Sequence, residues 1–146
     1  MDYDDIEILF AEDSQEDAML TIRALNKSGF KNKLLHVKDG VEALDFLYCR
    51  GIYSDRNPKS HPKLLLLDLK MPKMSGIQVL EKVKKDDNLK SIPVVILTSS
   101  QEDPDIAICY SMGANSYIVK PVDSNNFFIA IKEIGMYWMI LSQPST

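Results

Sequence analysis

The stretch Leu64-Leu65-Leu66-Leu67-Asp68 decides the fold of this 146-residue chain. Four consecutive leucines are apolar on both faces of an extended strand, as is typical of a strand buried in the middle of a parallel sheet. The carboxylate that follows them lies at the tip of that strand. A charge there is costly unless a cation or hydrogen bonds receive it. Asp68 therefore predicts a functional site at the carboxyl end of the sheet.

Four other short apolar runs resemble this one and alternate with helix-like segments. The predicted strands are Ile6–Ala11, Lys33–Val37, Lys63–Asp68, Pro93–Thr98 and Ser116–Val119. Five strand–helix units predict an α/β fold of three layers, in which helices cover both faces of a parallel sheet. At this length the usual (βα)5 arrangement is flavodoxin-like, with strand order 2-1-3-4-5.

Start and stop signals of helices lie between the strands. Ser14 with Asp17 three residues later resembles a capping box ahead of the first helix. Pro104 fits the first turn of the fourth helix, and Gly113 fits its end. The fifth helix is predicted from about residue 123 to about Leu141. No linker or second domain is indicated, so we expect one domain over residues 1–146, with a core of about 6–134.

Composition and charge exclude several classes of function. A net charge of −4 gives no electrostatic case for binding nucleic acid or an anionic membrane. The acidic start, residues 1–5, lacks the basic and apolar regions of a signal peptide, and no apolar stretch is long enough to span a bilayer. Cys49 and Cys109 have no metal-ligand spacing. We expect two reduced thiols in a cytoplasmic protein.

Polar residues also follow the other strands of the predicted sheet. Glu12 and Asp13 follow the first strand, Thr98 ends the fourth, and Lys120 follows the fifth. Strands 1 and 3 are neighbours at the topological switch point, so their three carboxylates converge with Asp68 among them. Mg²⁺ takes oxygen ligands and would hold such acids ionised. The alternative is that they cap the following helices or form surface ion pairs.

A carboxylate beside Mg²⁺ and a lysine can act as a nucleophile toward phosphorus. Phosphoryl transfer needs mainly positioning and charge neutralisation, which Mg²⁺ and Lys120 would supply to Asp68. Thr98 offers a hydroxyl to a phosphoryl oxygen. The backbone N–H groups predicted to complete the cradle are those of Leu69, Lys70 and Ser99.

This arrangement resembles the receiver domain of two-component response regulators, over residues 6 to about 134. The spacings agree with that family's pattern. Counted from Asp68, the matching positions are Gly76 after eight residues, Thr98 after thirty, Tyr117 after forty-nine and Lys120 after fifty-two, with Pro121 next and Gly113-Ala114 ahead of the fifth strand.

The resemblance implies roles for the acidic residues. Asp68 would accept a phosphoryl group from the phosphohistidine of a kinase. Asp13, Asp68 and the backbone carbonyl of Lys70 would bind Mg²⁺. Glu12 stands where many members have Asp and would reach the metal through water.

The resemblance also implies a switch and a control of lifetime. Phosphorylation adds charge and acceptor oxygens, which would draw Thr98 toward the site, and Tyr117 would turn inward into the released space. The alternative for Tyr117 is a half-buried strand aromatic. Lys70 and Ser100 occupy the two positions that influence the rate of dephosphorylation in the family.

Most receivers are joined to an output domain, whereas this chain stops soon after the fifth helix. The resemblance therefore implies a receiver that is not an enzyme acting on other molecules. It would signal to an unknown downstream protein through its fourth helix, fifth strand and fifth helix. A second apolar set on the fifth helix predicts a homodimer, unless the helix end folds back on its own domain. The predicted interface residues are Phe128, Met136, Tyr137, Met139 and Ile140.

A looser resemblance concerns stand-alone receivers that serve cyanobacterial phytochromes and related hybrid kinases. It rests on the loop Gly51–Pro62, on Tyr137-Trp138 and on Gln143-Pro144. It implies a sensor histidine kinase partner of hybrid or phytochrome-like type and a tendency to dimerise.

Three alternatives remain open at this point. A phosphorelay intermediate or phosphate sink would use the same chemistry. A Mg²⁺-dependent phosphatase of the haloacid dehalogenase type would need a second Asp two residues after the nucleophile, where this chain has Lys70. A docking module that works without phosphorylation would not need the intact acid, hydroxyl and lysine set.

Overall fold

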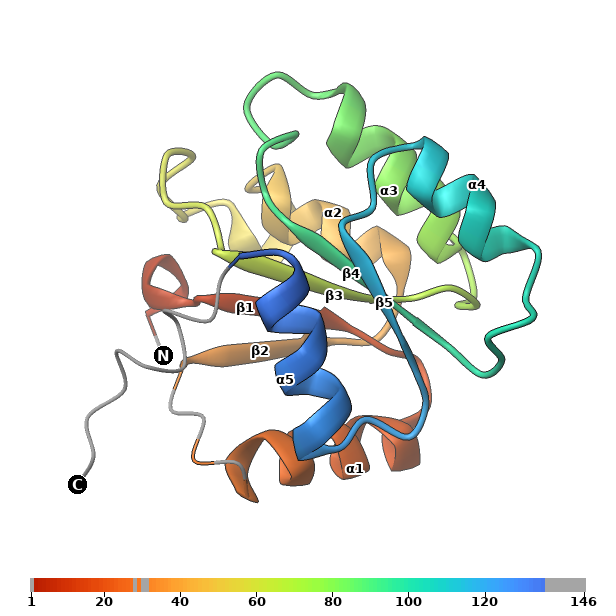
Figure 1. Cartoon of the computed structure of the whole chain (residues 1–146). Coiled ribbons are helices and arrows are strands. Elements are labelled where there is room, and N and C mark those ends of the chain that lie inside the picture. Colours follow the sequence, from red (N-terminus) through yellow and green to blue (C-terminus); the bar gives the residue numbers. More distant parts are fainter. Residues whose placement is uncertain (1, 28, 30–31, 136–146) are drawn as a thin grey trace.

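The computed structural model describes residues 2–27, 29 and 32–135 (Figure 1). Five strands form one sheet in the order β2-β1-β3-β4-β5, and all neighbouring pairs are parallel. The strands are β1 (Ile8–Ala11), β2 (Leu34–Val37), β3 (Leu64–Asp68), β4 (Val94–Thr98) and β5 (Ser116–Val119). The helices are α1 (Gln15–Lys27), α2 (Gly40–Leu47), α3 (Gly76–Lys85), α4 (Asp105–Ser111) and α5 (Ser124–Glu133), with short 3-10 helices η1 (Tyr3–Asp5) and η2 (Gly51–Tyr53). The predicted α/β fold and its strand order are confirmed.

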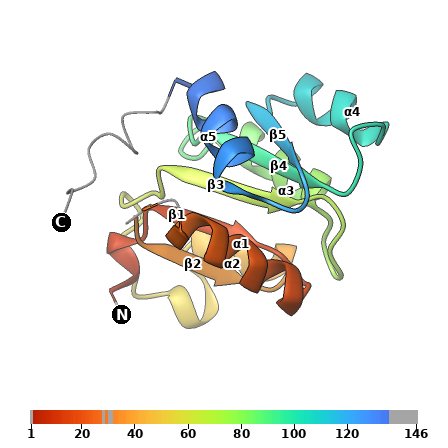
Figure 2. The same cartoon turned by 60° about the horizontal axis from the view of Figure 1, so that its bottom comes forward.

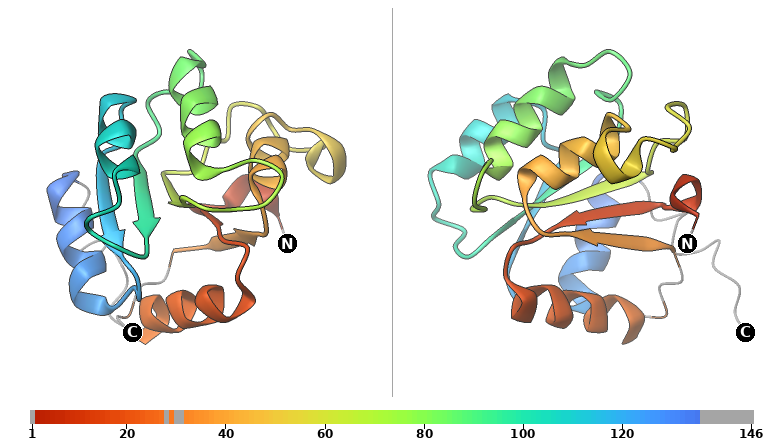
Figure 3. Two further views of the ribbon diagram at one scale, coloured as in Figure 1. Left: turned by 90° about the vertical axis from the view of Figure 1, so that its right-hand side faces the viewer. Right: turned by 180° about the vertical axis from the view of Figure 1, so that it is seen from behind.

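The helices form two layers around the sheet. Helices α1 and α5 cover one face, and α2, α3 and α4 cover the other (Figures 1, 2 and 3). Side chains of β3 alternate between the two cores. Leu64 and Leu66 pack with residues of α1 and α5, whereas Leu65 and Leu67 pack with residues of α2, α3 and α4. All four leucines are fully buried, as the apolar run predicts for a central strand.

The carboxyl ends of the strands agree with the prediction, and four strands begin one or two residues later than predicted. The register sets these ends level with one another. Ala11 pairs with Leu67, and Thr98 pairs with Val119. The residues that follow β1, β3, β4 and β5 therefore meet at one edge of the sheet.

The predicted helix signals lie at the ends of helices. Asp17 N–H donates to Ser14 Oγ at 3.1 Å, as a capping residue requires. Pro104 occupies the cap position before α4 rather than its first turn. Gly113, with φ +106°, follows the end of α4, because the left-handed conformation there favours glycine.

Helix α5 ends at Glu133, before the predicted end near Leu141, and residues 136–141 of the prediction lie outside the described part of the chain. Gly135 has φ +74°, a left-handed conformation that stops a helix. Phe127 and Ile131 are buried against the sheet. The predicted residues beyond 135 lie outside the described part of the chain. No described helix combines the length and the apolar character needed to cross a bilayer.

A buried arginine holds the long loop between α2 and β3. The guanidinium of Arg56 donates to the backbone carbonyls of Phe46 and Ser60. It also stacks on the Phe46 ring, 3.9 Å from the ring centroid. Tyr53 of the same loop donates from its hydroxyl to Glu42 of α2 at 2.8 Å. This loop is therefore fixed to the α2 side of the domain.

Candidate functional site

The polar residues at the carboxyl edge of the sheet surround a hollow of about 160 Å³. It opens between the ends of β1, β3, β4 and β5 and the first turn of α1. Its lining residues are Glu12, Asp13, Ser14, Asp17, Asp68, Leu69, Lys70, Thr98, Ser99, Asp103 and Lys120. The convergence predicted from strand order is therefore present in the structure.

Asp68 is the buried acid of this site, with 5% of its surface exposed. Its Oδ1 lies 3.1 Å from the Nζ atom of Lys120. Burial and the neighbouring carboxylate of Glu12 raise the pKa of Asp68 to about 7, and the ion pair with Lys120 only partly opposes them. Without a metal ion, the ionised form of Asp68 is therefore held at a cost in free energy.

Lys120 is the cation of the site and is largely buried, with 17% of its side chain exposed. Its Nζ lies 2.9 Å from Glu12 Oε1 and 3.1 Å from both Asp17 Oδ2 and Asp68 Oδ1. Burial alone would lower the pKa of Lys120, but hydrogen bonds and charge pairing with Glu12 and Asp68 raise it above its ordinary value. The lysine is therefore charged over the whole physiological pH range.

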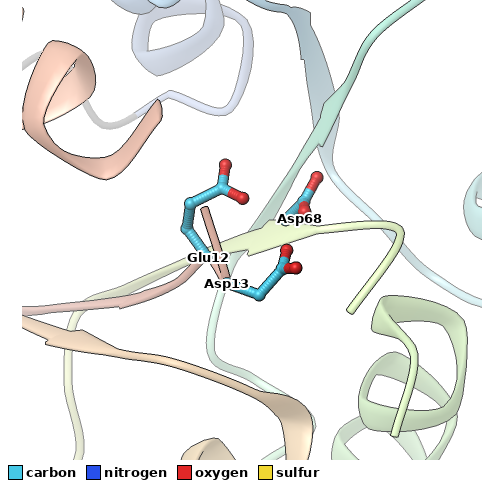
Figure 4. Close-up of side chains that lie close together, drawn as sticks. All are labelled: Glu12, Asp13 and Asp68. Atoms are coloured by element: carbon cyan, nitrogen blue, oxygen red, sulfur yellow. The ribbon is translucent and has the colours of Figure 1, made fainter. Parts of the chain in front are cut away.

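Three carboxylates of the site form a cluster suited to a hard cation (Figure 4). Glu12, Asp13 and Asp68 each offer an oxygen, and these oxygens lie within 4.8 Å of one another. Glu12 is fully buried, whereas Asp13 is exposed to solvent. One lysine does not neutralise three acids, and oxygen ligands of this kind match the preference of Mg²⁺. The residues present therefore fit the predicted metal.

Glu12 has contacts besides the acid cluster. Its Oε1 pairs with Lys120, and its Oε2 accepts a hydrogen bond from Ser14 N–H at 3.3 Å. The predicted water between Glu12 and the metal stays a prediction. Lys70, whose backbone carbonyl is the other predicted metal ligand, lines the hollow.

The predicted phosphoryl cradle needs one correction. The N–H of Leu69 donates to Leu97 O at 3.1 Å, which continues the bonding of β3 to β4. This donor is engaged in the sheet, so it is not free for a phosphoryl oxygen in this structure. The other two residues of the cradle, Lys70 and Ser99, line the hollow.

Thr98 ends β4 with its side chain buried at the edge of the hollow. Its Oγ1 lies 3.2 Å from the carbonyl of Ser100 and 3.5 Å from Oδ2 of Asp103, both as acceptors. Oγ1 itself accepts from Ser100 N–H at 3.3 Å. The hydroxyl is thus turned toward the loop before α4.

Tyr117 lies on β5, half-buried, and does not line the hollow. Its ring meets that of Tyr110 from α4 edge-to-face, with centroids 6.1 Å apart and planes at 84°. This geometry is favourable for two aromatic rings. Tyr110 therefore holds Tyr117 on the α4 side of the sheet.

Sequence reasoning missed two acidic residues of the site. The sequence indicates Asp17 only as part of a helix cap, and it gives no signal for Asp103. Asp17 lies in the first turn of α1, which begins two residues after Asp13, and this closeness to the end of β1 is the sequence signal that could have indicated it. Asp103 Oδ1 accepts from Asp105 N–H at 2.9 Å at the start of α4, a contact that depends on loop conformation and leaves no sequence signal.

The predicted dimer surface lies partly within the described residues. Phe128 on α5 is 43% exposed, as predicted, and its neighbour Ile129 is also exposed. The other predicted interface residues are Met136, Tyr137, Met139 and Ile140, which lie outside the described residues.

Comparison with characterised proteins gives a consistent result. The chain is 38% identical over 132 residues to a probable methanogenesis regulatory protein, FilR2, of Methanothrix harundinacea, covering 90% of this chain and 83% of the relative. It is 36% identical over 132 residues to the response regulator Rcp1 of Synechocystis, covering 90% of this chain and 88% of the relative.

Solved structures agree with these relatives. The bacteriophytochrome response regulator AtBRR is 46% identical, with a TM-score of 0.83 and coverage of 90% of this chain and 93% of that chain. Its counterpart RtBRR is 43% identical, with a TM-score of 0.85 and coverage of 94% and 83%. The profile of the response regulator receiver domain matches residues 8–132. The chain belongs to the response regulator receiver domain family.

Proposed function

We propose that this protein is a phosphorylation-driven switch in which Asp68 accepts a phosphoryl group from a histidine kinase. The observation that carries the proposal is the position of Asp68. It is a buried carboxylate, 3.1 Å from a charged lysine, within an acid cluster that fits Mg²⁺. Two relatives support it: Rcp1 has been solved in a Mn²⁺-bound form, and the cyanobacterial phytochrome response regulator RcpA has been solved phosphorylated.

The transfer is a substitution at phosphorus. A carboxylate oxygen of Asp68 forms the bond to phosphorus while the phosphorus–nitrogen bond of the donor phosphohistidine breaks. Asp13, Asp68 and the backbone carbonyl of Lys70 would hold Mg²⁺, and Glu12 would reach it through water. When bound, this ion would supply positive charge for the phosphoryl oxygens. Lys120 supplies the remaining charge, and Asp68 needs no general base because it reacts as the carboxylate.

The structural response to phosphorylation uses Thr98 and Tyr117, at the β4 and β5 end of the same sheet edge. In the phosphorylated state the Thr98 hydroxyl turns from Ser100 and Asp103 to a phosphoryl oxygen. Tyr117 then leaves Tyr110 and turns inward, which changes the surface formed by α4, β5 and α5. Lys70, which lines the hollow, and exposed Ser100 are the side chains that we expect to influence the rate of dephosphorylation.

The test of the acceptor is direct labelling. The protein is incubated with acetyl phosphate and Mg²⁺, and the intact mass of wild type and Asp68→Asn is measured. A single phosphoryl adduct on wild type that is lost in the variant supports the proposal. An Asp13→Asn variant is the matched control for the loss of one negative charge, and it should slow labelling but keep it on Asp68. A wild-type protein that forms no adduct contradicts the proposal.

The partners follow from the same proposal. The sequence similarity to bacteriophytochrome response regulators supports a sensor histidine kinase of phytochrome type as the partner. The two free cysteines support a cytoplasmic location. The receiver domain would act on an unknown downstream protein. A phosphorelay intermediate or phosphate sink would show the same labelling and would differ by passing the phosphoryl group to a histidine phosphotransfer protein.

We also propose a homodimer through the surface of α4, β5 and α5. Exposed apolar side chains on this surface support it, among them Ile108, Tyr110, Phe128 and Ile129. Light scattering with and without beryllofluoride, a phosphoryl mimic, tests the idea. Phe128→Asp should lower the apparent mass, and Met19→Asp on the exposed side of α1 is the control. A monomer under both conditions contradicts the dimer.

A further inference from the structure

Asp17 stands out because it contacts the reactive centre from outside the acid cluster. It lies in the first turn of α1, and its side chain is 42% exposed. The Nζ atom of Lys120 donates a hydrogen bond to Asp17 Oδ2 at 3.1 Å. The other partners of this ammonium, Glu12 and Asp68, are both buried members of the cluster.

The three donors of Lys120 match the three acceptors around it. An ammonium group has three N–H donors, and one carboxylate oxygen from each of Glu12, Asp17 and Asp68 lies within 3.1 Å. Transfer of a phosphoryl group changes only the third partner. Once an Asp68 oxygen is bonded to phosphorus, the carboxyl group loses its charge, and the N–H that pointed to it becomes available to a phosphoryl oxygen.

The two remaining carboxylates then decide where the ammonium stays. The charge of Glu12 is shared with the site that would hold Mg²⁺. Asp17 lies outside this cluster. It contacts the lysine from α1, although the two residues are 103 positions apart in the sequence. Asp17 is therefore the carboxylate whose hold on the lysine does not change when metal and phosphoryl group arrive.

We propose that Asp17 is a positioning residue of the phosphoryl-acceptor site, which anchors the Lys120 ammonium for contact with the phosphoryl group. The inference rests on the proposed function of Asp68. The alternative interpretation is an ordinary exposed ion pair between Asp17 and Lys120, which would contribute little to stability or to the labelling rate. The pair here differs because its lysine is largely buried and because it shares the cation with fully buried Glu12.

The test compares Asp17→Ala and Asp17→Asn with Glu16→Ala. Glu16 is the adjacent exposed acid in the same helical turn and does not line the hollow, so it matches the charge and the helix position. Labelling of Asp68 by acetyl phosphate in Mg²⁺ is followed by mass spectrometry over a range of donor concentrations. Asp17→Ala should lower the maximal rate constant by about 3- to 10-fold, with a smaller effect on half-saturation. Asp17→Asn should retain most of the rate, because the amide oxygen still accepts the N–H.

A double-mutant cycle identifies the path of the effect. In a Lys120→Gln background, Asp17→Ala should cause no further loss, since the residue through which it acts is gone. Equal losses in the two backgrounds, or equal rates for wild type, Asp17→Ala and Glu16→Ala, overturn the role of Asp17 alone. A wild-type protein that is never labelled at Asp68 instead overturns the proposed function, and this inference with it.

Discussion

Gly76 lies directly against the main chain of Asp68. A β-carbon added to Gly76 would lie 2.2 Å from the Asp68 carbonyl oxygen and 2.9 Å from the Cα of Leu69. Gly76 is the first residue of α3, and its N–H donates to Leu69 O at 2.9 Å. The start of α3 thus contacts the end of β3 at a separation that only glycine allows.

Replacement of Gly76 by alanine should therefore disturb both stability and labelling. Backbone atoms cannot yield as a flexible side chain would, so we expect Gly76→Ala to lower the free energy of unfolding by about 1–3 kcal/mol. Displacement of Asp68 should also slow its labelling by acetyl phosphate. Urea denaturation followed by circular dichroism measures the first effect. Glu81→Ala, on the exposed side of α3, is the control, and an equal stability of the two variants would refute the steric argument.

Asp68 should make stability depend on pH. Its pKa is about 7 in the folded protein and near 3.8 in the unfolded chain, so the folded protein binds the proton more tightly. The contribution of protonated Asp68 to the free energy of unfolding is thus full below about pH 4, and it is lost as pH rises through 7. Asp68→Asn lacks this loss. In the absence of metal, its stability relative to wild type should rise by about 1–3 kcal/mol between pH 4 and 8, after allowance for solvent screening.

The measurement is thermal unfolding of both proteins across this pH range, in EDTA and in Mg²⁺. Only the difference between the two proteins is used, because the contributions of groups remote from Asp68 cancel in it. Mg²⁺ binds the ionised acid, so it should stabilise wild type more at pH 8 than at pH 5. A difference that does not change with pH would show that Asp68 ionises as in the unfolded chain.

Lys120 should contribute far more to stability than a surface lysine. Lys120→Met leaves fully buried Glu12 and largely buried Asp68 without their cation, and we expect a loss of about 2–4 kcal/mol in the free energy of unfolding. Mg²⁺ should recover part of it by neutralising the same acids. Lys85→Met, which breaks an exposed pair with Glu81, should change stability by less than about 0.5 kcal/mol. Similar losses for the two variants would count against this electrostatic account.

The edge-to-face contact between Tyr110 and Tyr117 should oppose activation. If Tyr117 must leave Tyr110 to turn inward, Tyr110→Leu removes about 0.5–1.5 kcal/mol that favours the outward state. Beryllofluoride should then bind about 2- to 10-fold more tightly in Mg²⁺, as measured by calorimetry. Tyr48→Leu, remote from β5, is the control. Weaker or unchanged binding in Tyr110→Leu would mean that the contact does not distinguish the two states.

The sequence determines much of this architecture because the signals are local and repeated. The leucine run with its terminal Asp68 predicts a buried strand, and the same reading of four other runs predicts the whole sheet and its order. Once the order is known, the convergence of Glu12, Asp13 and Lys120 follows from topology alone. The acid cluster and the lysine therefore could be predicted before any coordinates.

Other features depend on geometry that no local pattern encodes. The Leu69 N–H was predicted to be free, but the register of β3 and β4 assigns it to Leu97. Asp17 contacts Lys120 because the fold brings the first turn of α1 beside the residue that follows β5. Apolar residues continue in the sequence beyond Gly135, and they led to the prediction of a longer α5. The left-handed backbone conformation of Gly135, and not the side-chain pattern, ends the helix.

Lys120 reaches Glu12 across 108 positions of the chain and Asp17 across 103. Contacts this distant in sequence form late, since the chain must close a long loop before they stabilise anything. A polypeptide that has not yet added β5 holds the acids of the site without their cation. The ability to receive a signal would in this way depend on completion of the fold. A chain that is unfinished or truncated before β5 would be inactive without any additional mechanism to inhibit it.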